Sequence, residues 1–117
     1  MFVQSLLTRN NYARLKPPFL QEIDPILESH LEETVFGVAE LCRILGISQP
    51  QLYRKVKAAS GQSTVQYIRS YRLQRGLVLL KTTTLSVTQI AYQVGFSDPA
   101  YFSRMFAREF GVPPSEI

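Results

Sequence analysis

Two arginines stand at matching places in the sequence, and both carry the chemistry needed to bind flat or negatively charged acceptors. Arg54 and Arg104 follow the helix-breaking glycines Gly46 and Gly95 by eight and nine residues. A guanidinium group can donate two parallel hydrogen bonds to a base edge such as that of guanine, or it can hold a phosphate. For Arg54 a third interpretation is open, in which the side chain braces the fold. The pair indicates a binding function, and the ligand has to be inferred from the structural elements that carry the two arginines.

No residue pattern favours catalysis. The sequence contains no phosphate-binding glycine loop, no cluster with metal-ligand spacing and no nucleophile with a base beside it, so we predict no enzymatic activity, no metal site and no cofactor. His30 is the sole histidine and has no second ligand at a suggestive spacing. Cys42 is the sole cysteine and lies on the apolar face of an expected helix, which favours inert packing over a reactive thiol.

The segment from Leu85 to Gly111 predicts two short helices with a sharp break between them. Its first apolar positions have the i, i+3, i+4, i+7 spacing of one helical face. They are Val87, Ile90, Ala91 and Val94. Gly95 ends this helix, and Asp98 with Pro99 begins the next. The apolar stripe of the second helix consists of Phe102, Met105, Phe106 and Phe110. The segment therefore predicts a helix-turn-helix unit.

The same pattern occurs earlier, in residues 36–61. Gly46 repeats the break, and Ser48 with Gln51 has the spacing of a capping box that begins a second helix. The apolar positions are Val38, Leu41, Cys42 and Leu45 in the first helix and Leu52 and Val56 in the second. If the later turn holds one extra residue, Leu52 aligns with Phe102, and Arg54 aligns with Arg104. We therefore predict a tandem of two units.

Residues 64–81 predict one long helix between the units, with Gly76 as its only internal breaker. About 18 residues give roughly 27 Å of helix at about 1.5 Å per residue. Successive major grooves on one face of a duplex are roughly 34 Å apart. Gly76 either permits closer packing or softens the helix, at a cost of about 1 kcal/mol relative to alanine. Arg69, Arg72 and Arg75 form a loose stripe, for which contact with phosphate and contact with internal acids are equally open.

Two segments precede the first unit. Apolar residues of 19–33 lie at helical spacing and predict a bracing helix, in which Pro25 marks either a start near Asp24 or a kink in a helix that begins earlier. Residues 1–18 predict a short helix or coil followed by a linker. An apolar patch in that segment suggests packing on something else, and it consists of Phe2, Leu6 and Leu7.

Composition and charge further limit the class of protein to which the chain can belong. The 117 residues, 45% of them hydrophobic, suit one domain with a modest core. No apolar run of about 18 residues and no signal-peptide core occurs, so we expect a soluble cytoplasmic segment. From Thr34 onward, lysine and arginine outnumber aspartate and glutamate by ten to four, whereas acids exceed bases before it. This excess alone leaves nucleic-acid binding and ordinary surface charge equally open, and the tandem units favour nucleic acid.

Together these features resemble the AraC/XylS family of bacterial transcription regulators, from about Phe19 to Ser115. The second unit carries the resemblance at Ile90, Ala91, Gly95, Phe96, Tyr101, Phe102, Phe106, Gly111 and Pro114, and the connecting helix carries it at Tyr67, Ile68, Arg69, Arg72, Leu73, Leu79 and Leu80. Gly76 departs from the alanine usual in the family. The resemblance implies an all-α fold of about seven helices, with two tandem helix-turn-helix subdomains joined by a long linker helix. The expected divisions are 1–18 as a linker and 19–117 as the DNA-binding domain, within which 19–61, 64–81 and 85–111 are the first unit, linker helix and second unit.

The resemblance also implies which residues contact DNA. The expected base-reading residues are Gln49, Pro50, Tyr53 and Arg54 in the first unit and Pro99, Ala100, Ser103 and Arg104 in the second. Arginine suits guanine and glutamine suits adenine, whereas proline and alanine offer only van der Waals contact, such as that with a thymine methyl. The expected phosphate contacts are the helix starts at Val38 and Val87, together with Lys55, Lys57 and Arg108.

The leading hypothesis is sequence-specific binding of double-stranded promoter DNA, with recognition helices in successive major grooves, by the output module of a transcription regulator. We expect RNA polymerase as a partner, an upstream sensory or receiver domain as in hybrid two-component regulators, and a nucleoid-associated location without membrane contact. In a hybrid sensor this segment is the cytoplasmic portion. The alternative is a protein-interaction or dimerisation module without DNA readout. Acidic reading helices would favour it, and only Glu109 is acidic there.

Overall fold

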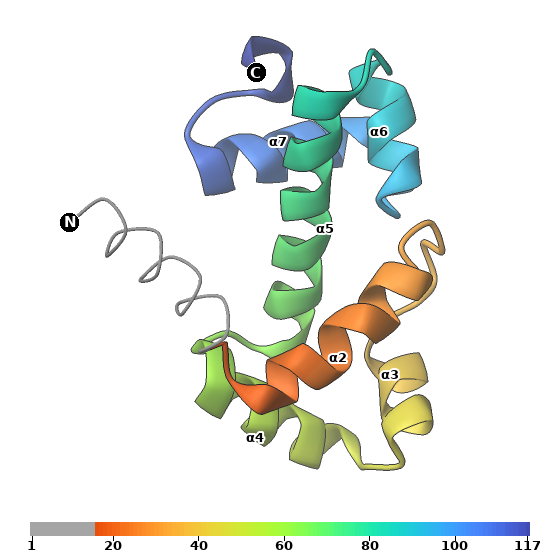
Figure 1. The fold of residues 1–117 in the computed structure, drawn as a ribbon, viewed down its shortest axis with the longest axis vertical. Coiled ribbons are helices and arrows are strands. Elements are labelled where there is room, and N and C mark those ends of the chain that lie inside the picture. The colour runs from red at the N-terminus through yellow and green to blue at the C-terminus, as the bar shows by residue number, and fades with distance from the viewer. Residues whose placement is uncertain (1–15) are drawn as a thin grey trace, which may run out of the picture.

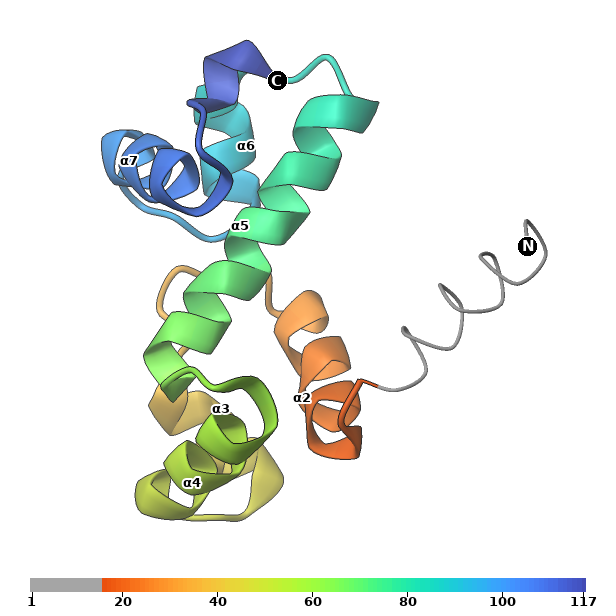
Figure 2. The same ribbon diagram turned by 90° about the vertical axis from the view of Figure 1, so that its left-hand side faces the viewer.

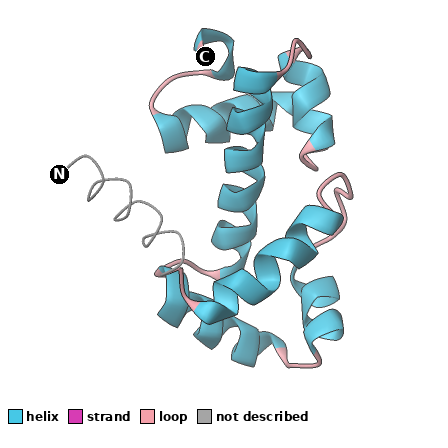
Figure 3. Cartoon of the chain, viewed as in Figure 1, coloured by secondary structure: helices cyan, strands magenta, loops and turns pink. Residues whose placement is uncertain are grey.

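The computed structural model describes residues 16–117, and all regular structure in that range is helical. The elements are α2 (Pro18–Ser29), α3 (Val38–Leu45), α4 (Gln49–Ser60), α5 (Thr64–Thr82), α6 (Val87–Gln93), α7 (Pro99–Phe110) and a 3₁₀ turn, η1 (Pro114–Glu116). Figures 1 and 3 show the two helix-turn-helix units at the two ends of α5. The all-α fold with two units and a linker helix is therefore confirmed. The patch at Phe2, Leu6 and Leu7 lies outside the described residues.

The long helix α5 separates the units and sets their arrangement. Its 19 residues correspond to roughly 28 Å of helix. In Figure 1, α4 crosses one end of α5 and α7 crosses the other, and both run in the same direction across the view. Figure 2 shows α2 and α7 on opposite sides of α5. The second helices of the two units, α4 and α7, therefore cross the linker helix α5 in the same direction.

The helix α2 braces the first unit, and its carboxyl end differs from the expectation. It begins at Pro18 and continues through Pro25, so the earlier of the two predicted starts is correct. It ends at Ser29 and leaves residues 30–37 as a loop, although apolar spacing continues to Leu31. A proline at the first helical position loses no hydrogen bond, which favours a start at Pro18.

Two tyrosine hydroxyls of α5 hold α2 in place. Tyr67 Oη donates to Asp24 Oδ1 and Tyr71 Oη donates to Glu28 Oε1, each at 2.6 Å. Burial and the carboxylate partner raise the pKa of both phenols, so both stay protonated as donors at neutral pH. These bonds join the bracing helix directly to the linker.

Each unit has its own hydrophobic core. The first core is largely aliphatic and joins α2 to the helices of the first unit through Leu20, Ile23, Leu27, Phe36, Leu41, Cys42, Leu52, Val56, Tyr67 and Ile68. The second is rich in phenylalanine and consists of Leu73, Ile90, Ala91, Val94, Phe96, Phe102 and Phe106. Cys42 is a free, buried cysteine, in agreement with a packing role.

Gly76 brings α5 and α7 close together. A Cβ atom at this position would lie 3.0 Å from both Cε1 and Cζ of Phe102, whose side chain is fully buried. The missing side chain therefore makes room for the aromatic ring. Of the two interpretations of Gly76, closer packing is the one that the contacts support.

Candidate nucleic-acid interface

The first surface predicted to read bases is the outer face of α4, here called the first reading surface, and its residues are Gln49, Pro50, Tyr53 and Arg54. All four are exposed, because Leu52 and Val56 on the opposite face are completely buried. A capping box fixes the start of the helix: Ser48 Oγ accepts from the Gln51 amide at 3.2 Å, and the Ser48 amide donates to Gln51 Oε1 at 2.9 Å. Among residues 16–117, Arg54 makes no hydrogen bond or ion pair, so the bracing interpretation has no contact to support it.

The second reading surface is the corresponding face of α7, and its residues are Pro99, Ala100, Ser103 and Arg104. Ala100 and Arg104 are exposed, whereas Pro99 and Ser103 are half-buried. Asp98 Oδ1 caps this helix by accepting from the Ala100 amide at 3.0 Å. The structure thus gathers the eight predicted residues into two surfaces, one on each unit.

A residue that the sequence analysis did not assign supports the second surface. The Arg104 Cζ atom lies 5.8 Å from the centroid of the Tyr101 ring, within the range of a cation–π contact. Tyr101 stands three residues before Arg104, so the two share a helical face. This i, i+3 spacing was the signal that could have identified the pair.

The two helix starts predicted as phosphate contacts have different electrostatic environments. At the start of α3, the Gly37 amide donates to Glu40 Oε1 at 2.9 Å, and this bond lowers the pKa of the Glu40 carboxyl. A carboxylate therefore already lies against the helix end at Val38. At the start of α6 near Val87, the cap is the neutral pair Ser86 and Gln89.

The remaining predicted phosphate contacts are all exposed. Lys57 Nζ donates to the Gly61 carbonyl at 3.0 Å, at the carboxyl end of α4. Lys55 Nζ lies 5.4 Å from the centroid of the Phe19 ring. Arg108 occupies the last turn of α7. Lys57 and Arg108 thus lie in the last turns of α4 and α7, whereas Val38 and Val87 begin α3 and α6.

The arginine stripe on α5 separates into three different roles. Arg75 Nε lies 3.0 Å from Glu28 Oε1, as expected for contact with an internal acid, although the bond angle does not meet hydrogen-bond geometry. Arg69 makes no hydrogen bond or ion pair within residues 16–117. Arg72 forms no ion pair with a carboxylate in residues 16–117. Its buried guanidinium donates to backbone carbonyls, and this burial lowers its pKa.

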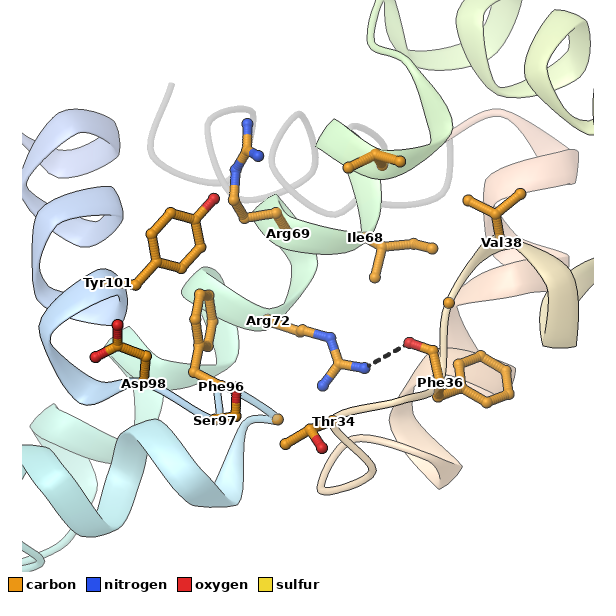
Figure 4. Close-up of a pocket in the computed structure, with 13 residues that line it drawn as sticks. Thr34, Phe36, Val38, Ile68, Arg69, Arg72, Phe96, Ser97, Asp98 and Tyr101 are labelled. Atoms are coloured by element: carbon orange, nitrogen blue, oxygen red, sulfur yellow. Dashed lines mark hydrogen bonds between the residues drawn. The ribbon is translucent and has the colours of Figure 1, made fainter.

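A groove of about 420 Å³ lies between the two units, along α5. Val38 lines one side and Asp98 and Tyr101 line the other, with Arg69 of α5 between them. Figure 4 shows Arg69 beside Tyr101, while Arg72 reaches toward the Phe36 carbonyl. Because Tyr101 also contacts Arg104, the groove adjoins the second reading surface.

Within residues 16–117, no helix is long and apolar enough to cross a membrane, and no group of three or more histidine, cysteine, aspartate or glutamate side chains is placed to hold a metal ion.

A family model described as a helix-turn-helix domain matches residues 41–117. The chain is 36% identical over 108 residues to the "HTH-type transcriptional activator RhaS" of Enterobacter sp. strain 638, covering 92% of this chain and 37% of the relative. It is 35% identical over 97 residues to "Histidine kinase P4" of Formosa agariphila, covering 83% of this chain and 7% of the relative. The chain therefore spans well under half the length of these curated relatives.

Solved structures share the fold. An AraC-type transcriptional regulator from Chromobacterium violaceum superposes with a TM-score of 0.77 and 31% identity, covering 85% of this chain and 88% of that one. The DNA-binding domain of AdpA, solved in complex with a target DNA, gives a TM-score of 0.75 and 27% identity, covering 83% and 86% of the two chains.

Proposed function

We propose that this chain, which belongs to the AraC family of helix-turn-helix transcription regulators, binds double-stranded DNA sequence-specifically with α4 and α7 in successive major grooves. The observation that carries the proposal is the arrangement of the two reading surfaces. Both helices cross α5 in the same direction at its two ends (Figure 1). The roughly 28 Å of linker helix is comparable with the roughly 34 Å between successive grooves.

Base readout is proposed for the eight residues of the two surfaces. Arg54 and Arg104 are suited to guanine, and Gln49 is suited to adenine, because their planar groups match the paired hydrogen-bonding positions of those bases. Pro50, Pro99 and Ala100 carry no side-chain donor and are assigned apolar contact with thymine methyls. Tyr53 and Ser103 supply hydroxyl groups beside the two arginines.

Phosphate contacts are proposed for a second group of residues, which position the domain without reading sequence. This group contains the predicted residues Val38, Lys55, Lys57, Val87 and Arg108. Arg69 joins it, because its charge has no internal partner within residues 16–117 and its side chain lines the groove between the two units. The DNA backbone between two successive major grooves passes that position if both helices are engaged. Glu40 weakens the case for Val38, since its carboxylate repels a phosphate.

The alternative function is a protein-interaction or dimerisation module. The only acidic side chain on a reading helix, Glu109, accepts a hydrogen bond from Ser70 Oγ at 3.0 Å. Glu109 thus bonds to the linker helix and lies outside both reading surfaces, which contain only neutral or basic side chains. This distribution favours DNA over a basic protein partner.

For the longer protein, we propose that this domain is the output module of a transcription regulator. One relative is named a histidine kinase, which fits an upstream sensory domain, and another is named an activator, which fits a contact with RNA polymerase. A DNA-binding output module acts at the nucleoid, in the cytoplasm. In a hybrid sensor it forms part of the cytoplasmic portion. Within this module we propose three parts, which are the first helix-turn-helix unit at 19–61, the linker helix at 64–81 and the second unit at 85–111.

The experiment starts with a duplex recovered by the wild-type chain from a random-sequence pool. Binding to that duplex and to a shuffled duplex is measured by fluorescence anisotropy at physiological salt, because phosphate contacts dominate at low salt. Arg54→Ala and Arg104→Ala are each expected to weaken binding to the selected duplex by about 5- to 150-fold, from about 1–3 kcal/mol per bidentate contact. Binding to the shuffled duplex is expected to change much less.

Arg43→Ala is the matched control, because Arg43 is an exposed arginine of α3 outside both reading surfaces. It is expected to change binding to the two duplexes equally. Equal wild-type affinity for selected and shuffled DNA would contradict sequence-specific binding and favour the protein-interaction alternative.

A further inference from the structure

Arg72 occupies the junction between the two units. It belongs to α5 and is buried. Its Nη1 atom donates to the carbonyls of Leu31 at 2.7 Å and Val94 at 2.9 Å. Its Nη2 atom donates to the carbonyls of Glu33 and Phe36, each at 3.1 Å. One side chain therefore satisfies four backbone acceptors.

Those four acceptors come from both units. Leu31, Glu33 and Phe36 lie in the loop that leads into α3, whereas Val94 lies at the end of α6. Because Nη1 binds a carbonyl from each side, the guanidinium joins the entry of the first unit to the turn of the second. A planar group with five donors in a fixed geometry holds such acceptors at defined angles, which a flexible amine cannot do.

The turn of the second unit is shaped around this side chain. A Cβ atom at Gly95 would lie 1.3 Å from Arg72 Nη1 and 2.5 Å from the Leu31 carbonyl oxygen. At Gly46, the corresponding glycine of the first unit, a Cβ atom would meet nothing within 4 Å. The absence of a side chain at Gly95 is thus required by the arginine as well as by the left-handed backbone.

We propose that Arg72 is a positioning residue that determines which spacing between two DNA half-sites the domain accepts. This inference rests on the proposed function, because it concerns the relative placement of the two reading surfaces. Fixing the loop before α3 against the end of α6 fixes α4 relative to α7. Arg72 itself touches no DNA in this account.

The helical geometry of DNA explains why a residue that fixes the two units would limit the accepted number of base pairs between two half-sites. Adding or removing one base pair shifts a half-site by about 3.4 Å and rotates it by about 35° around the duplex axis. A rigidly joined pair of surfaces then engages only one half-site, whereas a loosely joined pair can follow the shift. Loosening the junction therefore broadens the accepted spacing and leaves the preference for each half-site unchanged.

The test compares the wild-type chain with Arg72→Lys and Arg72→Met. The probes are the duplex selected by the wild-type chain, the same duplex with one base pair inserted or removed between its half-sites, and a duplex with one half-site only. For the wild-type chain, a changed spacing is expected to lower affinity by about 10-fold or more, because the second surface no longer adds to binding. For both variants this penalty is expected to fall to about 3-fold or less, with unchanged affinity for the single half-site.

A second measurement does not depend on DNA. Spin labels are attached at Ala58→Cys in α4 and Thr88→Cys in α6, in a Cys42→Ala background, and the distance between them is measured in the free chain. The wild-type junction is expected to give a narrow distance distribution, and Arg72→Lys and Arg72→Met a broader one. Far-UV circular dichroism is expected to show unchanged helix content.

The outcomes separate this inference from the proposed function. A wild-type chain that selects no sequence contradicts the proposed function, while the label distances still test the positioning role. Variants that keep the full spacing penalty, or the narrow distance distribution, overturn the inference. Loss of helix content in both variants also overturns it, since Arg72 would then be needed for the fold itself.

Discussion

The two helix-turn-helix units share one local pattern and use it differently. Both turns contain a glycine with positive φ, 71° at Gly46 and 91° at Gly95. At Gly46 the positive φ is the whole reason for a glycine, because there is open space where a side chain would be. At Gly95 the arginine of the linker fills that space. The turn at Gly95 therefore contributes to the contact between the two units, whereas the turn at Gly46 contributes only to the local fold of the first unit.

A second difference lies in the first turn of each reading helix. The repeat aligns Gln51 with Tyr101. Gln51 closes the capping box with Ser48, while Tyr101 packs beside Arg104 and lines the groove between the units. In the first unit this position stabilises the helix start. In the second it supports a reading side chain.

The largest expected effect tests the contrast between the glycines. Gly46→Ala is expected to lower the free energy of unfolding by about 1–2 kcal/mol, the cost of a left-handed non-glycine residue. Gly95→Ala is expected to lower it by about 2–5 kcal/mol, because a steric clash in a packed site adds to that strain. Urea denaturation of both variants measures the difference. Equal losses would show that the Arg72 contact does not constrain the second turn.

The next effect concerns the packing of the second unit on α5. Gly76→Ala gains about 1 kcal/mol of helix propensity, but its Cβ atom would crowd the buried Phe102 ring, at a typical cost of about 1–3 kcal/mol. We expect a net loss of about 1 kcal/mol in the free energy of unfolding. Adding Phe102→Leu should remove the crowding, so the two changes together should be less harmful than their sum. Additive effects in a double-mutant cycle would argue against this contact.

The caps of the two reading helices give an effect of comparable size. Ser48→Ala and Asp98→Ala should each cost about 1 kcal/mol of unfolding free energy. The loss at Asp98 should shrink as salt is added, because part of it is the attraction between a carboxylate and the helix dipole. The loss at Ser48, an uncharged cap, should not depend on salt. Thermal unfolding at low and high ionic strength distinguishes the two, and identical salt responses would remove the contrast.

The smallest effect tests the support of Arg104 by Tyr101. Tyr101→Leu keeps an apolar side chain and removes the ring face, so selected-duplex binding should weaken by about 2- to 5-fold, from about 0.5–1 kcal/mol for an exposed cation–π contact. In an Arg104→Ala background the same change should have little effect, whereas in an Arg54→Ala background its full effect should persist. A full effect in the Arg104→Ala background would assign Tyr101 an independent role.

Local pattern was sufficient to predict the helices. The repeat with its two glycines predicted both units, and the caps at Ser48 and Asp98 predicted the starts of α4 and α7 within one residue. These signals are local, because a cap and its amide lie two or three residues apart. The exposure of the first reading surface, and of Ala100 and Arg104 in the second, followed from the apolar positions on the opposite faces of the helices.

The features that the sequence did not predict depend on contacts between distant residues. Arg72 binds carbonyls that lie 22 to 41 residues away, and nothing in the arginine stripe distinguished it from Arg69 and Arg75. The contact of Gly95 with Arg72 could not be predicted, because the left-handed conformation at a helix end already explains a glycine at this position. Pro25 was ambiguous because a proline can start a helix or lie within one, and the packing of α2 decides between them.

In the proposed function two separate surfaces read two half-sites one duplex turn apart, and selection of bound sequences from random DNA can show whether they do. The wild-type chain should enrich two conserved blocks about 10–10.5 base pairs apart, centre to centre. Arg54→Ala should lose base preference in one block only, and Arg104→Ala in the other only. A single enriched block, or two variants that relax the same block, would contradict the account.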